Sequence, residues 1–166
     1  FYPGEGANAS TACVPCSPGH ACNATGLAMP NEVVEAGYFA RVYASSATPA
    51  YGSKTDVTCS AASWERCDYG PCPAGYACPA GTGDPVLCAA GRYAPNTSSV
   101  ECDVCPGRRR CPGGVVEGAR TDQTYPCFEG HWCPEGTGVL PPKCPPGRYG
   151  GAGWGEQSAS DEGFSC

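Results

Sequence analysis

The chain is short of the residues that build a conventional hydrophobic core. It contains no isoleucine, and Leu, Val and Phe together supply only 18 of its 166 residues. That share, about 11%, lies well below the roughly 20% under which a chain struggles to bury a core. No stretch approaches the roughly 18 consecutive apolar residues of a membrane-spanning helix, so no membrane span is expected in this segment. A single large globular interior is not expected either.

Residues typical of catalysis and metal binding are scarce as well. The chain has two histidines, His20 and His131, and no signature of a serine hydrolase or a zinc protease. Two C-x2-C pairs, beginning at Cys13 and Cys102, have a spacing found in zinc sites, but they lie far apart within longer series of cysteines. A net charge of −6 disfavours nucleic acid as a partner. We therefore expect no enzyme, no cofactor and no bound metal.

Cysteine, glycine and proline are abundant instead. The 15 cysteines predict disulfides that replace hydrophobic burial by restricting the unfolded chain, each contributing roughly 2–4 kcal/mol. Disulfides persist outside the cytosol, so the sequence predicts a secreted or cell-surface protein. Because 15 is odd, at least one cysteine is free, or pairs with another chain or with a residue outside this segment, and we favour the last two.

Two features of the chain support this location. Three of its four asparagines begin N-x-Ser/Thr sequons, so we expect covalent N-linked glycans at Asn8, Asn23 and Asn96. Phe1 opens a polar, glycine-containing stretch without the pattern of a signal peptide. We therefore expect a mature form or a segment of something longer.

The cysteines form a repeat. Four segments share a C-x5-C spacing: Cys16 to Cys22, Cys72 to Cys78, Cys105 to Cys111 and Cys127 to Cys133. In three of them a glycine stands three residues after the first cysteine and a Tyr or His follows it. The Cys105 copy departs, with Gly107 one place early and Arg109 at the ring position. Equivalence with tyrosine indicates that His20 and His131 pack rather than catalyse.

The pattern resembles the cysteine-rich ephrin-receptor-like repeats, which are similar to short EGF-like or TNF-receptor-like modules. Its carriers are CVPCSPGHAC at Cys13, CPAGYACPAGT at Cys72, CDVCPGRRRCPGG at Cys102 and CFEGHWCPEGT at Cys127. The resemblance implies closure of the loops that contain x-x-G-x-Y, and hence the pairs Cys88 with Cys102 and Cys144 with Cys166. Similar repeats occur in flagellar-hair (mastigoneme) and other surface proteins of protists and algae.

The expected fold is small and disulfide-rich, an elongated tandem of short β-hairpin and turn modules with almost no helix. We expect an N-terminal arm at 1–12, a first repeat with an insertion at 13–66, a second at 67–110 and a third at 111–166. Strands of two or three residues should link the turns, and the best helical candidate is a single turn at 31–36. Tyr76, Tyr93, Tyr149 and Trp132 are expected to cover disulfides. With so little core in each module, neighbouring modules should stack end to end into a rod.

The leading functional hypothesis is a structural extracellular glycoprotein, a disulfide-stapled rod that forms a homo-oligomer or filament as a fibril or surface coat. The alternative is a ligand-binding or spacer module of a receptor ectodomain, with its contact surface near Tyr38 to Tyr51. Candidate assembly contacts are the arginine run and two large rings: Arg108, Arg109, Arg110, Trp154 and Phe1. The rings either dock on a neighbour or pack locally on a disulfide.

Three interpretations of the arginine run remain open. It is a solvated loop, a contact with the acidic tail of a neighbouring copy (Glu156, Asp161 and Glu162), or a site for a sulfated or acidic glycan.

Overall fold

The structure, a computed structural model, describes residues 2–3, 13–55, 58–113 and 124–150. Its strands are two or three residues long, as expected. In chain order the elements are β1 (Tyr2–Pro3), β2 (Cys13–Val14), β3 (His20–Ala21), β4 (Glu32–Val33), β5 (Tyr38–Ala40), the 3-10 helix η2 (Ala61–Arg66), β6 (Tyr69–Pro71), β7 (Tyr76–Ala77), β8 (Val86–Leu87), β9 (Arg92–Tyr93), β10 (Asp103–Val104), β11 (Arg109–Arg110) and β12 (Tyr125–Pro126).

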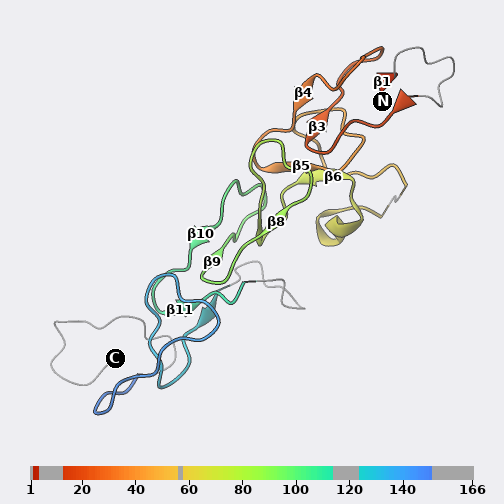
Figure 1. Cartoon of the computed structure of the whole chain (residues 1–166). Helices are drawn as coiled ribbons and strands as arrows, with labels where there is room; N and C mark the ends of the chain where they lie inside the picture. Colours follow the sequence, from red (N-terminus) through yellow and green to blue (C-terminus); the bar gives the residue numbers. More distant parts are fainter. Residues whose placement is uncertain (1, 4–12, 56–57, 114–123, 151–166) are drawn as a thin grey trace. The chain divides into compact units, whose positions relative to one another are not determined.

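Neighbouring strands pair in chain order into two-stranded sheets (Figure 1). The pairing is antiparallel, with Phe39 opposite Gly70 in β5 and β6, and Arg110 opposite Tyr125 in β11 and β12. The fold is therefore a small disulfide-rich tandem of hairpins with almost no helix. The expected helical turn at 31–36 is wrong, because Glu32 and Val33 pair with β3. The 3-10 helix η2 lies instead within the loop closed by the disulfide between Cys59 and Cys67.

The chain forms two compact units. Unit 1 contains residues 1–86 and 97–101, and unit 2 contains 87–96 and 102–166. The three repeats expected from the cysteine spacing stay a prediction.

One turn recurs along the described residues, each time within seven residues. The N–H of the fifth residue donates to the C=O of the second at 3.0–3.3 Å, and the fourth residue has a φ between 70° and 90°. A positive φ at the third position of a four-residue turn is what a type II turn requires, and glycine provides it in all but one copy. We call seven of these copies the turn segments: 16–22, 34–40, 72–78, 88–94, 105–111, 127–133 and 144–150. Two more copies of the turn, at 79–82 and 134–137, follow directly after 72–78 and 127–133.

Five of the six consecutive pairs of turn segments are joined by two main-chain hydrogen bonds. The fourth residue of one segment donates its N–H to the C=O of the seventh residue of the next segment. Its own C=O accepts from the N–H of that segment's first residue. Both bonds, at 2.7–3.2 Å, are present for the fourth residues Gly19, Gly37, Gly91, Arg108 and Gly130. The positive φ therefore serves two purposes, because it forms the turn and directs both polar groups at the neighbour.

Disulfides close four of the seven turn segments, from the first residue to the seventh: Cys16–Cys22, Cys72–Cys78, Cys105–Cys111 and Cys127–Cys133. The structure also joins Cys88 to Cys102, the pairing that the resemblance implied. Cys144 is disulfide-bonded as well, but its expected partner, Cys166, lies outside the described residues. Among the cysteines that the structure describes, Cys13 is free.

The segment 34–40 matches the disulfide-closed segment 105–111 although it contains no cysteine. The C=O of Val34 accepts from the N–H of Gly81 at 2.8 Å, and the C=O of Cys105 accepts from Gly136 at the same distance. Val34 therefore stands where Cys105 stands.

The seventh residues of these two segments correspond in the same way. The N–H of Ala40 donates to Thr82 at 3.0 Å, and the N–H of Cys111 donates to Thr137 at 2.9 Å. Val34 and Ala40 are fully buried and pack with Ala21 and Ala44 into a small aliphatic cluster. Aliphatic packing replaces the disulfide in this copy.

A second cluster in unit 1 combines one ring with three cysteines. Phe39 is buried against Cys67, Cys72 and Cys78, and Trp64 and Tyr76 pack on the outside. Tyr76 therefore covers a disulfide as expected. By contrast, Tyr149 is 64% exposed, so the expectation that it also packs is wrong.

We predict that Val34→Cys with Ala40→Cys forms a further disulfide. Closing a seven-residue loop should stabilise unit 1 by about 2 kcal/mol. Intact mass before and after reduction would detect the bond, and thermal unfolding would measure the gain. Val34→Cys alone is the control, since it repeats the change in packing without closure. A double variant that keeps two free thiols under oxidising conditions would contradict the equivalence.

We also predict that glycines at the same position of two different turn segments differ in how well they tolerate substitution by alanine. A Cβ at Gly91 would collide with the C=O of Gly136, whereas a Cβ at Gly130 meets nothing within 4 Å. Both residues have positive φ, so Gly130→Ala should cost about 1–2 kcal/mol and Gly91→Ala about 1–3 kcal/mol more. Denaturant unfolding under non-reducing conditions would compare them. Equal losses would show that crowding at Gly91 is absent.

Candidate functional site

The hairpin of β11 and β12 in unit 2 holds the arginine run. Arg109 and Arg110 form β11, and Arg108 is the fourth residue of its turn segment, with φ 70°. The other turn segments have glycine at this position. A left-handed conformation costs a residue with a Cβ roughly 1–2 kcal/mol, because the Cβ approaches the following carbonyl oxygen.

The main chain keeps the shared geometry despite the substitution. The N–H of Arg108 donates to the C=O of Cys133 at 2.8 Å, and its C=O accepts from the N–H of Cys127 at 3.2 Å. Gly107, one place early in the sequence, does not take over the left-handed position. An arginine therefore occupies a position whose left-handed conformation favours glycine.

The three arginines have different surroundings. Arg108 and Arg109 are exposed. One Nη of Arg109 donates to Thr124 Oγ1 at 3.1 Å. Arg110 is half-buried, with its guanidinium 4.1 Å from the ring centre of Phe128 and 4.9 Å from that of Tyr125.

These contacts change the expectation for Arg110. Its Nε is buried with no hydrogen-bond partner among the described residues. The aromatic faces take the place of a charged partner, since each attracts the cation through its quadrupole. Arg110 therefore anchors the hairpin, and Arg108 and Arg109 are the arginines that face outward.

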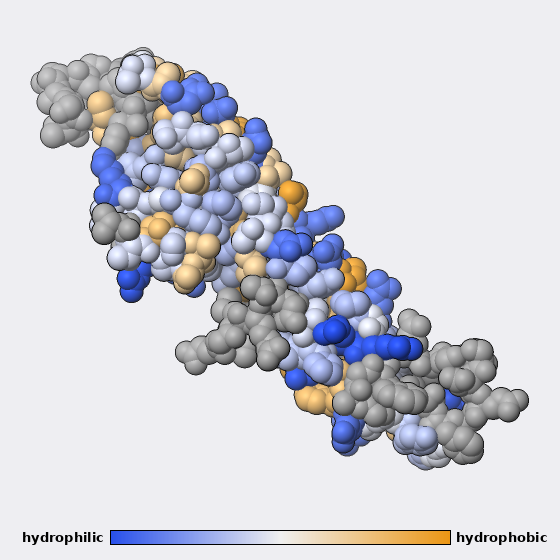
Figure 2. Space-filling view, turned by 180° about the vertical axis from the view of Figure 1, so that it is seen from behind, coloured by the Kyte–Doolittle hydropathy of each residue, from blue (hydrophilic) through white to orange (hydrophobic). Residues whose placement is uncertain are grey.

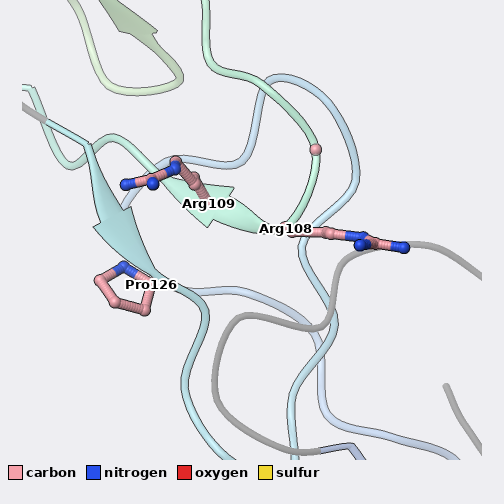
Figure 3. Close-up of a pocket in the computed structure, with 4 residues that line it drawn as sticks. Arg108, Arg109 and Pro126 are labelled. Atoms are coloured by element: carbon pink, nitrogen blue, oxygen red, sulfur yellow. The ribbon is translucent and has the colours of Figure 1, made fainter.

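A hollow of about 260 Å³ lies beside this hairpin. It is lined by Gly107, Arg108, Arg109 and Pro126 (Figure 3). Figure 3 shows the side chains of Arg108 and Arg109 pointing in opposite directions from β11. In the part of the chain that the structure describes, no carboxylate forms an ion pair with either residue.

Charge differs between the two units. In unit 2 the described residues include six basic and three acidic side chains, whereas in unit 1 they include three basic and six acidic ones. Figure 2 shows hydrophilic residues over much of one face of the molecule, with hydrophobic residues scattered among them. The arginine hairpin thus lies in the more basic unit of an acidic chain.

Unit 1 holds a different arginine, whose role is structural. Arg41 lies over Phe39 and Trp64, donates to the C=O of Cys67 at 2.6 Å, and forms an ion pair with Asp84 at 2.5 Å. It fixes η2 and its disulfide to β5. Trp64 therefore packs locally.

The other predicted site residues are spread over the chain. Asn23 and Asn96 are exposed. The Nδ2 of Asn23, the atom that would carry a glycan, donates to a carboxylate oxygen of Glu32 at 3.2 Å. Asn8, Phe1 and Trp154 lie outside the described residues.

The two histidines occupy the same place in their turn segments. The Nδ1 of each lies about 3 Å from the C=O two residues earlier, that of Pro18 for His20 and that of Glu129 for His131. The equivalence expected from the repeat is therefore visible in the contacts.

Comparison with known proteins gives no relative from which to take a function. No family model, no curated protein and no solved structure matches the chain. Its disulfide content is consistent with an extracellular or secreted protein. The residues that the structure describes include no helix long and apolar enough to cross a bilayer.

We predict that Arg108→Gly stabilises the protein by up to about 1 kcal/mol. Glycine relieves the left-handed strain, and its greater freedom in the unfolded chain offsets part of the gain. Arg108→Ala is the matched control, because it removes the same charge but keeps a Cβ. Chemical denaturation of both variants and the parent protein would test this. A loss of stability in the glycine variant would mean that the arginine side chain holds the fold.

Proposed function

We propose that the protein is a structural extracellular glycoprotein that assembles head to tail into a fibril or surface coat. The observation that carries the proposal is the repeated junction between turn segments. It is heterologous: the fourth residue of one segment holds the two ends of the next. A contact of this kind does not close on itself and is naturally extended by further copies.

The energetics of the described residues support a scaffold. The largest fully buried side chains are Phe39 and Val34, and the others in this group are cysteines. Stability is distributed over local turns and disulfides, each making contacts mainly with its neighbours. A protein built in this way gains length by adding modules and needs no central interior.

Two further features fit an assembled glycoprotein. Asn23 and Asn96 present their sequons at the surface, where glycans extend into solvent. Cys13 is half-exposed and free, and the odd number of cysteines is consistent with pairing to a second chain or to a residue outside this segment. We assign no catalytic role to the chain.

A receptor ectodomain module is the second candidate. Its expected contact surface, Tyr38 to Tyr51, is partly occupied within unit 1. Tyr38 packs against the aliphatic cluster and Tyr51 against the cysteine cluster, and burial raises the pKa of the Tyr51 hydroxyl. These contacts favour the scaffold over a ligand-binding surface at this place.

We predict that the pure, oxidised, glycosylated chain forms polymers as its concentration rises. Sedimentation velocity and light scattering should show species that grow beyond the 17.0 kDa chain mass plus its glycans. Non-reducing peptide mapping of the polymers would report whether Cys13 links two chains. A monomer that persists at millimolar concentration would favour the receptor module and refute the fibril.

A further inference from the structure

The conformation of Arg108 shows that its side chain is kept at a cost. Six turn segments use glycine at the left-handed position and one uses arginine, and Arg108 makes the same two main-chain hydrogen bonds as Gly19, Gly37, Gly91 and Gly130. Strain of this kind persists where the surroundings impose it, and it is characteristic of functional sites. Because the shared junction needs only main-chain atoms, the side chain of Arg108 is free for another purpose.

The donors that line the hollow are almost entirely guanidinium groups. The N–H of Arg108 is bonded to Cys133, and that of Arg109 to the C=O of Pro106. Pro126 offers no N–H. One way for a peptide to bind a β structure is to add a strand through free main-chain groups. Here the N–H groups of Arg108 and Arg109 are already paired, so a ligand would meet mainly the two guanidinium groups and the apolar ring of Pro126.

The directions of the two side chains define the shape of that ligand. Arg108 and Arg109 point away from one another (Figure 3), so one small anion cannot contact both. A linear polyanion can, because it places separate anionic groups on either side of the hairpin. Thr124 holds Arg109 through one Nη, and among the described residues no other side-chain hydrogen bond of Arg109 is present.

We propose that the arginine hairpin binds a sulfated polysaccharide, with separate sulfate groups on Arg108 and Arg109. Sulfate stays ionised at all physiological pH values, and the planar guanidinium donates paired hydrogen bonds to its oxygens. A sugar ring lies over the apolar floor at Pro126. Arg110 positions the hairpin through its aromatic contacts. The inference does not depend on head-to-tail assembly, because a monomer carries the whole site.

The test is the affinity of the full chain for immobilised heparin, measured at protein concentrations where the chain is monomeric. Arg108→Ala and Arg109→Gln should each weaken binding about tenfold, the usual effect of losing a charged hydrogen bond. Arg92→Gln is the matched control: Arg92 occupies the same fifth position of its turn segment, and its Nη1 donates to the C=O of Cys102 at 2.9 Å. It should change the affinity less than twofold.

Arg108→Gly separates binding from folding. It should weaken heparin binding as much as Arg108→Ala while the melting temperature rises. An equal loss in the Arg92 variant would show a general charge effect and overturn the site. Equal binding of desulfated heparin would overturn the sulfate assignment. Tighter binding of a synthetic peptide of residues 151–166 would assign the arginines to the acidic tail of a neighbouring copy instead.

Discussion

The structure depends on one backbone conformation, the left-handed fourth residue of each turn segment. In five of these segments the N–H and the C=O of that single residue point at the two ends of the next segment and bond to both. Satisfying two main-chain groups in this way orders the chain without a large apolar interior. The short strands follow from it, because each of β3, β5, β7, β9 and β11 begins directly after such a residue.

The disulfides reinforce this arrangement but do not define it. Four turn segments are closed by a disulfide, and 34–40 keeps the same turn and the same junction with valine and alanine. In 88–94 the first residue, Cys88, pairs outside its segment and the seventh residue, Ala94, is buried. These segments therefore share two features. Their first and seventh residues are cysteine, valine or alanine, which can be buried, and the residues between them form the turn and its main-chain hydrogen bonds.

The cysteine spacing predicted the architecture well and the turn segments only in part. It identified four of the seven turn segments, the short strands and the near absence of helix, because cysteine and glycine at fixed spacing constrain the local backbone strongly. The x-x-G-x-Y pattern marks 88–94 and 144–150, and Gly37-Tyr38-Phe39 corresponds to it in 34–40, but the sequence does not show that these segments form the same turn, since none of them ends on a second cysteine. For the same reason 31–36 was assigned to a helix, although Val34 begins a turn.

The candidate site was only partly readable from sequence. The sequence shows the arginine run, and it shows that Gly107 stands one place before the position that glycine takes in the other C-x5-C segments. The hydrogen bonds of the turn then place Arg108 at the left-handed fourth position. The separate roles of the arginines are not readable, because they depend on Tyr125 and Phe128 flanking Arg110. Those contacts require the pairing of two strands, β11 and β12, that have 14 residues, 111–124, between them in the sequence.

A junction made of main-chain atoms alone has a consequence for how such a chain can vary. Its complementarity resides in backbone conformation, so the side chains around it are not bound by the need to recognise one another. Histidine, tyrosine and arginine all stand immediately after the left-handed residue in different copies. The exposed side chains of one turn segment can thus change, and with them its surface chemistry, while the neighbouring segments and the backbone architecture stay the same.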